Sequence, residues 1–186
     1  MPSSNSTAKP NAHMRMSLAA KARMRSTERD VYKYYNDMGK NKGHCTWGAG
    51  ILAHRGVCSK EELGKKVSVT SVEIEFERRV AEAERGVKRC VVAELNQEQF
   101  DAIVSLTYNA GVSGSLDTYK YLNRKDFAGA ASNISTMIRV RVGGKFVIAP
   151  GLIKRRAEEA HHFASPLRPY RLRTNKPGSK KCSIFV

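Results

Sequence analysis

The fold is decided by the stretch LNQEQFDAIVSLTYNAG, residues 95–111. Its large apolar side chains recur at helical spacing and form one broad hydrophobic face, made of Phe100, Ile103, Val104 and Tyr108. Asn96 is suited to cap the first turn with Gln99 as its capping-box partner, and Gly111 is a natural stop. An apolar face this wide predicts the central helix of a folded domain.

The segments around this helix predict further helices and a small antiparallel sheet. Four of them have helical composition or spacing: 17–27, 71–89, 115–123 and 126–140. Pro150 is suited to open a last helix. The aromatic and β-branched run VYKYY, residues 31–35, predicts a strand, and CTW before Gly48 predicts a second one. Turn residues lie between these two strands, so we expect the strands to pair.

Chain length and the distribution of charge predict one domain with a tail at each end. The 186 residues carry a net charge of +16, and residues 167–186 contain six basic residues and no acidic one. We assign a disordered leader to residues 1–16, the domain to residues 17–166 and a basic tail to residues 167–186. A basic surface implies an anionic partner, such as an acidic wall polymer or an anionic membrane. Nucleic acid is disfavoured, because the sequence lacks zinc-ligand spacing, an RNP-like strand and a basic heptad array.

The sequence shows no secretory signal and no membrane span. Basic residues interrupt the first 25 positions, so no apolar h-region forms, and no run approaches the roughly 18 apolar residues of a span. We therefore expect the protein to be made in the cytoplasm. The four cysteines contain no CxxC pair. Cys45 and Cys58 could pair in an oxidising compartment, but free buried thiols are the default expectation.

Two acidic residues and a hydroxyl lie in one short stretch: Glu28, Asp37 and Thr46. Hydrolysis of a glycosidic bond needs one carboxylic acid to protonate the leaving oxygen and a second carboxylate to activate water or attack the sugar. Glu28 and Asp37 are separated by a predicted strand and followed by a Gly-rich turn that carries Thr46. This arrangement could place the two carboxyl groups in one cleft. His161 and His162 have no third ligand at helical spacing nearby, so no metal site is predicted.

Three blocks of the sequence, taken in order, resemble the phage-type lysozymes, the muramidases or endolysins that break the host wall at the end of infection. The first runs from Glu28 to Gly50 and has an acid, eight residues, an Asp and then a Thr-x-Gly-x-Gly turn. The second is the helical stretch 95–111. The third comprises YLNRKDFAGAA and GGKFVIAPGLIKRRAEEAHHF, residues 121–131 and 143–163. The interval between Asp37 and Thr46 is longer than is usual in that family.

The resemblance implies a fold class and an activity. The fold would be α+β and mostly helical, with a small N-terminal sheet lobe, a long connecting helix, a helical C-terminal lobe and a cleft between the lobes. The protein would be a monomeric peptidoglycan hydrolase without a cofactor. It would cleave the β-1,4 bond between N-acetylmuramic acid and N-acetylglucosamine and so cause bacterial lysis.

The resemblance also implies roles for single residues. Glu28 is expected to be the general acid, Asp37 to position the attacking water, and Thr46 to hold the water or the sugar. Because the family is inverting, we expect direct attack by water without a covalent intermediate. The side chains expected to bind substrate are Tyr108, Asn109 and Arg156. Arg156 could meet the carboxylates of the wall, or it could lie on a solvated helix face paired with the glutamates that follow it.

Two alternatives remain open at this point. A lytic transglycosylase needs a catalytic acid but no water-positioning Asp, so the presence of Asp37 argues against it. A cationic protein that binds wall or membrane would act through residues 167–186, whose basic and apolar residues suit anionic surfaces. We expect an enzyme to act on the wall in the periplasm, after release by a holin or a secretion system, either in phage lysis or in attack on another bacterium.

Overall fold

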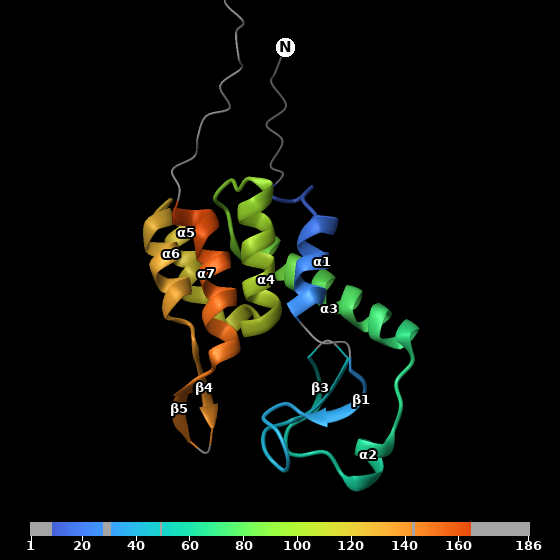
Figure 1. Cartoon of the computed structure of the whole chain (residues 1–186). Coiled ribbons are helices and arrows are strands. Elements are labelled where there is room, and N and C mark those ends of the chain that lie inside the picture. The colour runs from blue at the N-terminus through green and yellow to red at the C-terminus, as the bar shows by residue number, and fades with distance from the viewer. Residues whose placement is uncertain (1–8, 28–30, 49, 143, 165–186) are drawn as a thin grey trace, which may run out of the picture.

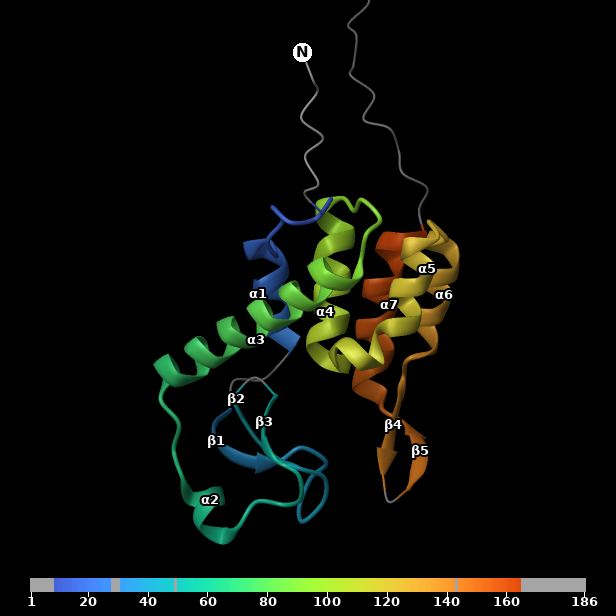
Figure 2. The ribbon, with the colours of Figure 1, turned by 180° about the vertical axis from the view of Figure 1, so that it is seen from behind.

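A small sheet lobe and a larger helical lobe make up the molecule (Figure 1). The structure is a computed structural model that describes residues 9–27, 31–48, 50–142 and 144–164. The small lobe contains β1 (Val31–Asn36), β2 (Cys45–Gly48), β3 (Ile51–His54) and α2 (Lys60–Gly64). The long helix α3 (Val69–Cys90) then leads to the large lobe, as Figure 2 shows from behind. The large lobe contains α1 (Leu18–Thr27), α4 (Gln97–Gly114), α5 (Leu116–Asn123), α6 (Phe127–Thr136), β4 (Arg139–Val142), β5 (Lys145–Ile148) and α7 (Pro150–Ala164). The predicted α+β, mostly helical architecture is confirmed.

Helix α4 is the centre of the large lobe, as its sequence predicts. The side chain of Asn96 accepts from the amide of Gln99 over 2.8 Å, and the side chain of Gln99 accepts from the amide of Asn96 over 3.2 Å. Gly111 has φ 74°, which breaks the helical geometry at the predicted stop, although one further turn follows. Four apolar side chains of α4 are fully buried: Phe100, Ile103, Val104 and Leu106. Each stabilises the fold by about 1.5–3 kcal/mol through loss of apolar surface to the interior.

The small lobe is a three-stranded antiparallel sheet in the order β1-β2-β3. The two predicted strands are present, and β3 is an additional one. Tyr35 of β1 pairs with Thr46 of β2, and Cys45 of β2 pairs with His54 of β3. The short run ILAH of β3 lacks a clear alternation of apolar and polar residues, so its pattern did not mark it as a strand.

A second, two-stranded sheet interrupts the large lobe where a helix was expected. The helix predicted for residues 126–140 ends at Thr136, and Arg139 begins β4. Val140 and Val142 alternate with arginines, which favours a strand, and Gly144 has φ 82° in the turn to β5. The helical spacing before Thr136 extended the predicted helix too far.

Cys45 and Cys58 form a disulfide, with an S–S distance of 2.06 Å. The default expectation of free thiols is therefore wrong for this pair, whereas Cys90 is free. The turn after β3 returns the chain to β2, where the amide of Cys45 donates to the carbonyl of Gly56 over 2.7 Å. This turn brings the two cysteine Cα atoms to 4.6 Å, a proximity that spacing in the sequence does not reveal.

Removing this bridge with the pair Cys45→Ser and Cys58→Ser should lower the free energy of unfolding by about 3 kcal/mol. The bridge spans a sequence separation of 13, and a loop of about 15 residues restrains the unfolded chain by roughly that amount. Urea unfolding of the oxidised protein in EDTA measures the difference. Cys90→Ser, which leaves the bridge intact, is the control and should cost less than about 1 kcal/mol. Equal midpoints with and without the bridge would contradict the prediction.

The N-terminal boundary of the domain lies earlier than the predicted leader allows. Asn11 is 1% exposed, and its side chain donates to the carbonyls of Val91 and Ala93 over 3.2 and 2.8 Å. The amide of Met16 donates to Glu84 over 2.8 Å. Residues 9–16 therefore belong to the packed domain, while the predicted tail at 167–186 lies outside the described residues. In the part of the chain that the structure describes, no helix has both the length and the apolarity to cross a membrane.

Candidate active site

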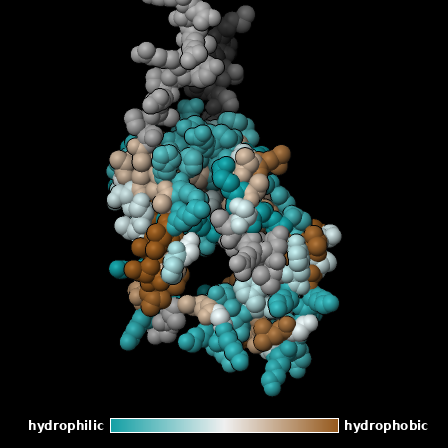
Figure 3. Space-filling view, viewed as in Figure 1, coloured by the Kyte–Doolittle hydropathy of each residue, from teal (hydrophilic) through white to brown (hydrophobic). Residues whose placement is uncertain are grey.

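A pocket of about 300 Å³ lies where the small lobe faces α4. The residues that line it are Tyr35, Asp37, Thr46, Gly50, Leu52, Tyr108 and Asn109. Figure 3 shows a hollow between the small lobe and the β4–β5 hairpin, so this side of the molecule is open to a large substrate. Four residues expected from the sequence to act on or bind substrate thus meet in one place, although they come from segments far apart in the chain.

Asp37 follows directly after β1 and is held by the turn that leads to β2. Its carboxylate oxygen Oδ1 accepts from the amide of His44 over 2.7 Å, and its own amide donates to the carbonyl of His44 over 3.1 Å. Gly43 has φ 83°, and a Cβ at that position would lie 2.0 Å from Asp37 Oδ1. A glycine is therefore required at position 43 to leave space for the Asp37 carboxylate.

Thr46 lies on β2 and is 3% exposed, with its hydroxyl near the same turn. Thr46 Oγ1 donates to the carbonyl of His44 over 3.2 Å. His44 thus contacts both Asp37 and Thr46 through its backbone. The disulfide at the adjacent Cys45 also ties β2 to the segment before α2.

Tyr108 and Asn109 form the opposite wall of the pocket, on the last turns of α4. The Tyr108 ring packs against Phe76 of α3 with ring centroids 5.8 Å apart. The side-chain oxygen of Asn109 accepts a hydrogen bond from Arg156 of α7. This bond orients the Asn109 amide, because its oxygen faces the interior and its NH₂ group is the part left for the pocket.

Arg156 lies beneath this wall rather than on the surface of the pocket. It is 2% exposed, and it donates to Glu159 over 2.6 Å and to the carbonyl of Met137 over 3.1 Å. Glu159 also accepts from Ser105 of α4 over 2.7 Å. The structure therefore corrects both expectations for Arg156: it is neither solvated nor placed to meet wall carboxylates, and it reaches the pocket wall only through its hydrogen bond to Asn109.

Arg79 of α3 links the helical part of the molecule to the sheet. Its Nε donates to Glu75 over 2.9 Å, and its Nη2 makes a long hydrogen bond of 3.5 Å to the carbonyl of Leu52, a residue that lines the pocket. A hydrogen bond from Arg78, followed by one from Arg79, lowers the pKa of Glu75 to about 2. Glu75 thus stays ionised at neutral and mildly acidic pH, and its bond to Arg79 persists there.

Glu28, the expected general acid, lies outside the described residues. The structure describes the chain on both sides of it, where α1 ends at Thr27 and β1 begins at Val31. Its role therefore stays a prediction from the sequence.

The family model for phage lysozymes matches residues 26–159, an interval that includes the whole small lobe and the pocket. The chain belongs to the phage lysozyme family. This membership confirms the resemblance seen in the sequence and supports a peptidoglycan hydrolase of the glycosidase class, with lysozyme-type activity.

Individual lysozymes and endolysins agree with this membership. An endolysin of Acyrthosiphon pisum secondary endosymbiont phage 1 is 28% identical over 137 residues, which are 73% of this chain and 93% of that protein. The solved endolysin from Escherichia coli O157:H7 phage FAHEc1 has a TM-score of 0.68 at 28% identity and covers 81% of this chain and 94% of its own. A mutant P22 lysozyme has a TM-score of 0.58 at 25% identity, and the match covers 82% of this chain and 99% of that lysozyme. The lysozyme-like fold is therefore shown.

Some residues of this lysozyme-family pocket were not identified from the sequence. Tyr35 and Leu52 line it, but an aromatic or leucine within a short strand carries no signal that separates it from a packing residue. Gly43 could have been found, because it stands in the Gly-punctuated turn directly before His44. Its role nevertheless depends on the position of the Asp37 side chain, which only the folded turn sets.

Proposed function

We propose that this member of the phage lysozyme family hydrolyses the β-1,4 bond between N-acetylmuramic acid and N-acetylglucosamine with inversion at the sugar carbon. Glu28 protonates the leaving oxygen, and Asp37 and Thr46 direct the attacking water. One observation carries the proposal: Asp37 and Thr46 of the small lobe line the same pocket as Asn109 of α4. A glycan strand lying between the lobes would meet all three.

Asp37 is suited to hold a water molecule in a fixed orientation. The hydrogen bond from the His44 amide to Oδ1 restricts rotation of the carboxylate. The second oxygen, Oδ2, then offers an acceptor whose direction the turn has set. A carboxylate held in this way can take a proton from water as the water attacks, which is the base role in an inverting glycosidase.

Thr46 supplies a second acceptor for the same water. Because its hydroxyl proton points to the carbonyl of His44, the lone pairs of Oγ1 remain for a hydrogen bond from water. With one water proton on Asp37 and the other on Thr46, the oxygen lone pair faces the sugar. The two residues together therefore orient the nucleophile.

Asn109 is suited to recognise the sugar from the opposite wall. Its oxygen is engaged by Arg156, so its NH₂ group donates to an acceptor on the substrate. Acetamido carbonyls and hydroxyls of the glycan are acceptors of this kind. An oriented donor of this kind favours ligands that carry a matching acceptor.

A lytic transglycosylase is the competing enzyme, and product chemistry separates the two. Mass spectrometry of digested sacculi should show reducing muramic acid ends, because water is the acceptor in hydrolysis. NMR during the first turnovers should show the α anomer, since inversion of a β bond yields that product. Products with 1,6-anhydro ends would reject hydrolysis, and a first-formed β anomer would reject inversion.

The proposed place of action is the cell wall, reached in the periplasm after release by a holin or a secretion system. The basic tail at residues 167–186 would add attraction to anionic groups of wall or membrane. That part of the proposal rests on sequence alone.

A further inference from the structure

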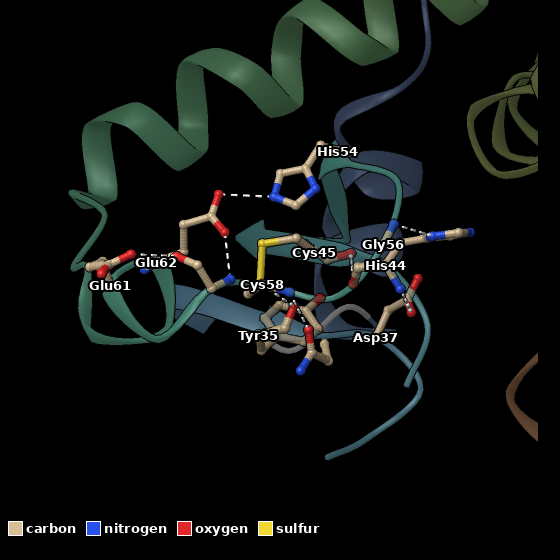
Figure 4. Close-up of a disulfide and its surroundings, with 12 residues drawn as sticks. Tyr35, Asp37, His44, Cys45, His54, Gly56, Cys58, Glu61 and Glu62 are labelled. Carbon is tan, nitrogen blue, oxygen red and sulfur yellow. Dashed lines mark hydrogen bonds and ion pairs between the residues drawn. A yellow bond between two sulfur atoms is a disulfide. The ribbon is translucent and has the colours of Figure 1, made fainter. Parts of the chain in front are cut away.

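Two side chains with metal-ligand chemistry, His54 and Glu62, lie beside the Cys45–Cys58 disulfide of the small lobe (Figure 4). Cys45 of β2 pairs with His54 of β3 across the sheet, so these two side chains lie on one face. The Cys45 sulfur, a ring nitrogen of His54 and a carboxylate oxygen of Glu62 all lie within 4.8 Å of one another. Cys58, bonded to Cys45, completes the group.

The His54 ring is oriented as a metal-binding histidine is. Its Nδ1 lies 3.1 Å from the carbonyl of Arg55, and its Nε2 lies 2.9 Å from Oε1 of Glu62. A proton on Nδ1 donates to the carbonyl, and a second proton on Nε2 lies between the ring and Glu62. Histidines that ligate metals commonly donate their other ring nitrogen to a backbone carbonyl in this way. A cation between Nε2 and Oε1 would replace the proton that the two atoms now share.

Glu62 is held by its own helix, independently of the disulfide. Its Oε2 accepts from the amide of Ser59 over 2.7 Å, as part of the capping box that opens α2. Its Oε1 is the oxygen directed at His54. Strand pairing positions Cys45 and His54, and the helix cap positions Glu62 next to Cys58. The cluster is therefore organised by backbone structure that does not require the S–S bond.

We propose that the dithiol form of this chain binds one Zn²⁺ through Cys45, Cys58, His54 and Glu62. Two thiolates, an imidazole and a carboxylate are ligand types that zinc accepts in tetrahedral sites. The sequence predicted no metal, because these four residues share no metal-ligand spacing and meet only after the sheet and α2 have formed.

The two states differ by two electrons. Reduction of the disulfide by a phosphine gives two thiols, while the phosphine takes an oxygen from water and becomes its oxide. Zinc then displaces the protons of both thiols and of His54 Nε2, which pass to the buffer. In the reverse direction, oxidised glutathione accepts two electrons from the two thiolates and two protons from the buffer, and becomes two glutathione molecules. The disulfide forms again, and zinc leaves as an unchanged cation.

Zinc would replace the disulfide as the link between β2 and the segment before α2 wherever thiols are kept reduced, and it would add β3 and α2 to that link through His54 and Glu62. Thr46 is adjacent to Cys45, so the same link supports the pocket. The binding site itself does not depend on the proposed catalytic function.

Cobalt titration of the full chain, reduced with a phosphine, tests the proposal. The protein carries Cys90→Ser and Cys182→Ser, so that Cys45 and Cys58 are the only thiols that can bind the metal. We expect one Co²⁺ per chain, with tetrahedral d–d bands and a thiolate-to-cobalt charge-transfer band, displaced by one Zn²⁺. The oxidised protein should show neither band. Absence of the charge-transfer band in the reduced protein would overturn the proposal.

Variants assign the remaining ligands. His54→Gln and Glu62→Gln should each weaken zinc binding by roughly tenfold or more, whereas Glu61→Gln, the neighbouring carboxylate in α2, should not. Unchanged affinity in His54→Gln would reject the assignment. Because a variant can fail to fold, X-ray absorption of the zinc-bound background protein gives a second measurement. Two sulfurs at about 2.3 Å and two lighter ligands at about 2.0–2.1 Å are expected, and any other ratio contradicts the site.

Discussion

Glu28→Gln will abolish the release of muropeptides from purified sacculi. Glutamine matches glutamate in size and polarity but has no proton to give to the leaving oxygen at any working pH. A positioned general acid contributes about 10²–10⁴-fold in rate, so the residual activity should fall to the detection limit of a turbidity assay. Binding to sacculi should be unchanged, because the substitution leaves the pocket of Asp37, Thr46 and Asn109 intact.

The matched control for this experiment is Glu94→Gln, an exposed carboxylate in the segment before α4. It should retain full activity, which separates loss of the acid from loss of one negative charge. Far-UV circular dichroism of both variants verifies that they fold. Lysis of purified sacculi by Glu28→Gln at the wild-type rate would remove Glu28 from the mechanism and favour a cationic wall-binding protein.

Arg156→Met should lower the free energy of unfolding by about 3–5 kcal/mol, the second large effect we expect. Arg156 is 2% exposed and Glu159 4% exposed, and the two bond over 2.6 Å in the interior. Removing one member of a buried ion pair leaves an uncompensated charge, which costs about that much. Arg155 at 3.4 Å from Glu159 offsets part of the loss. Guanidinium unfolding measures the change.

Lys154→Met on the same helix is the control for Arg156→Met. The Lys154 side chain is 85% exposed, and its ion pair with Glu158 spans 3.8 Å, so the change should stay within about 0.5 kcal/mol. Adding Glu159→Leu to Arg156→Met should recover part of the stability, since the buried Glu159 carboxylate is then removed together with its partner. An Arg156→Met protein of wild-type stability with weakened substrate binding would instead place Arg156 on the substrate.

Local sequence determined the elements of this protein wherever the interactions are short in range. The Asn96 cap, the apolar face of α4 and the start of α7 at Pro150 each depend on residues within a few positions of one another. The family blocks are equally local, so the lysozyme likeness and the fold class were accessible from the sequence. Asp37 and Thr46 could be named for the same reason, since one turn connects them.

Tertiary structure alone decided which partners these residues meet. The side chain of Arg156 is buried because α7 packs against α4, and the same charged residue on a free helix would be solvated. Cys45 and Cys58 bond because the turn after β3 folds back onto β2, and strand pairing and the cap of α2 bring His54 and Glu62 beside them. Burial and long-range proximity are properties of the packed chain, and no spacing of residues along the sequence specifies them.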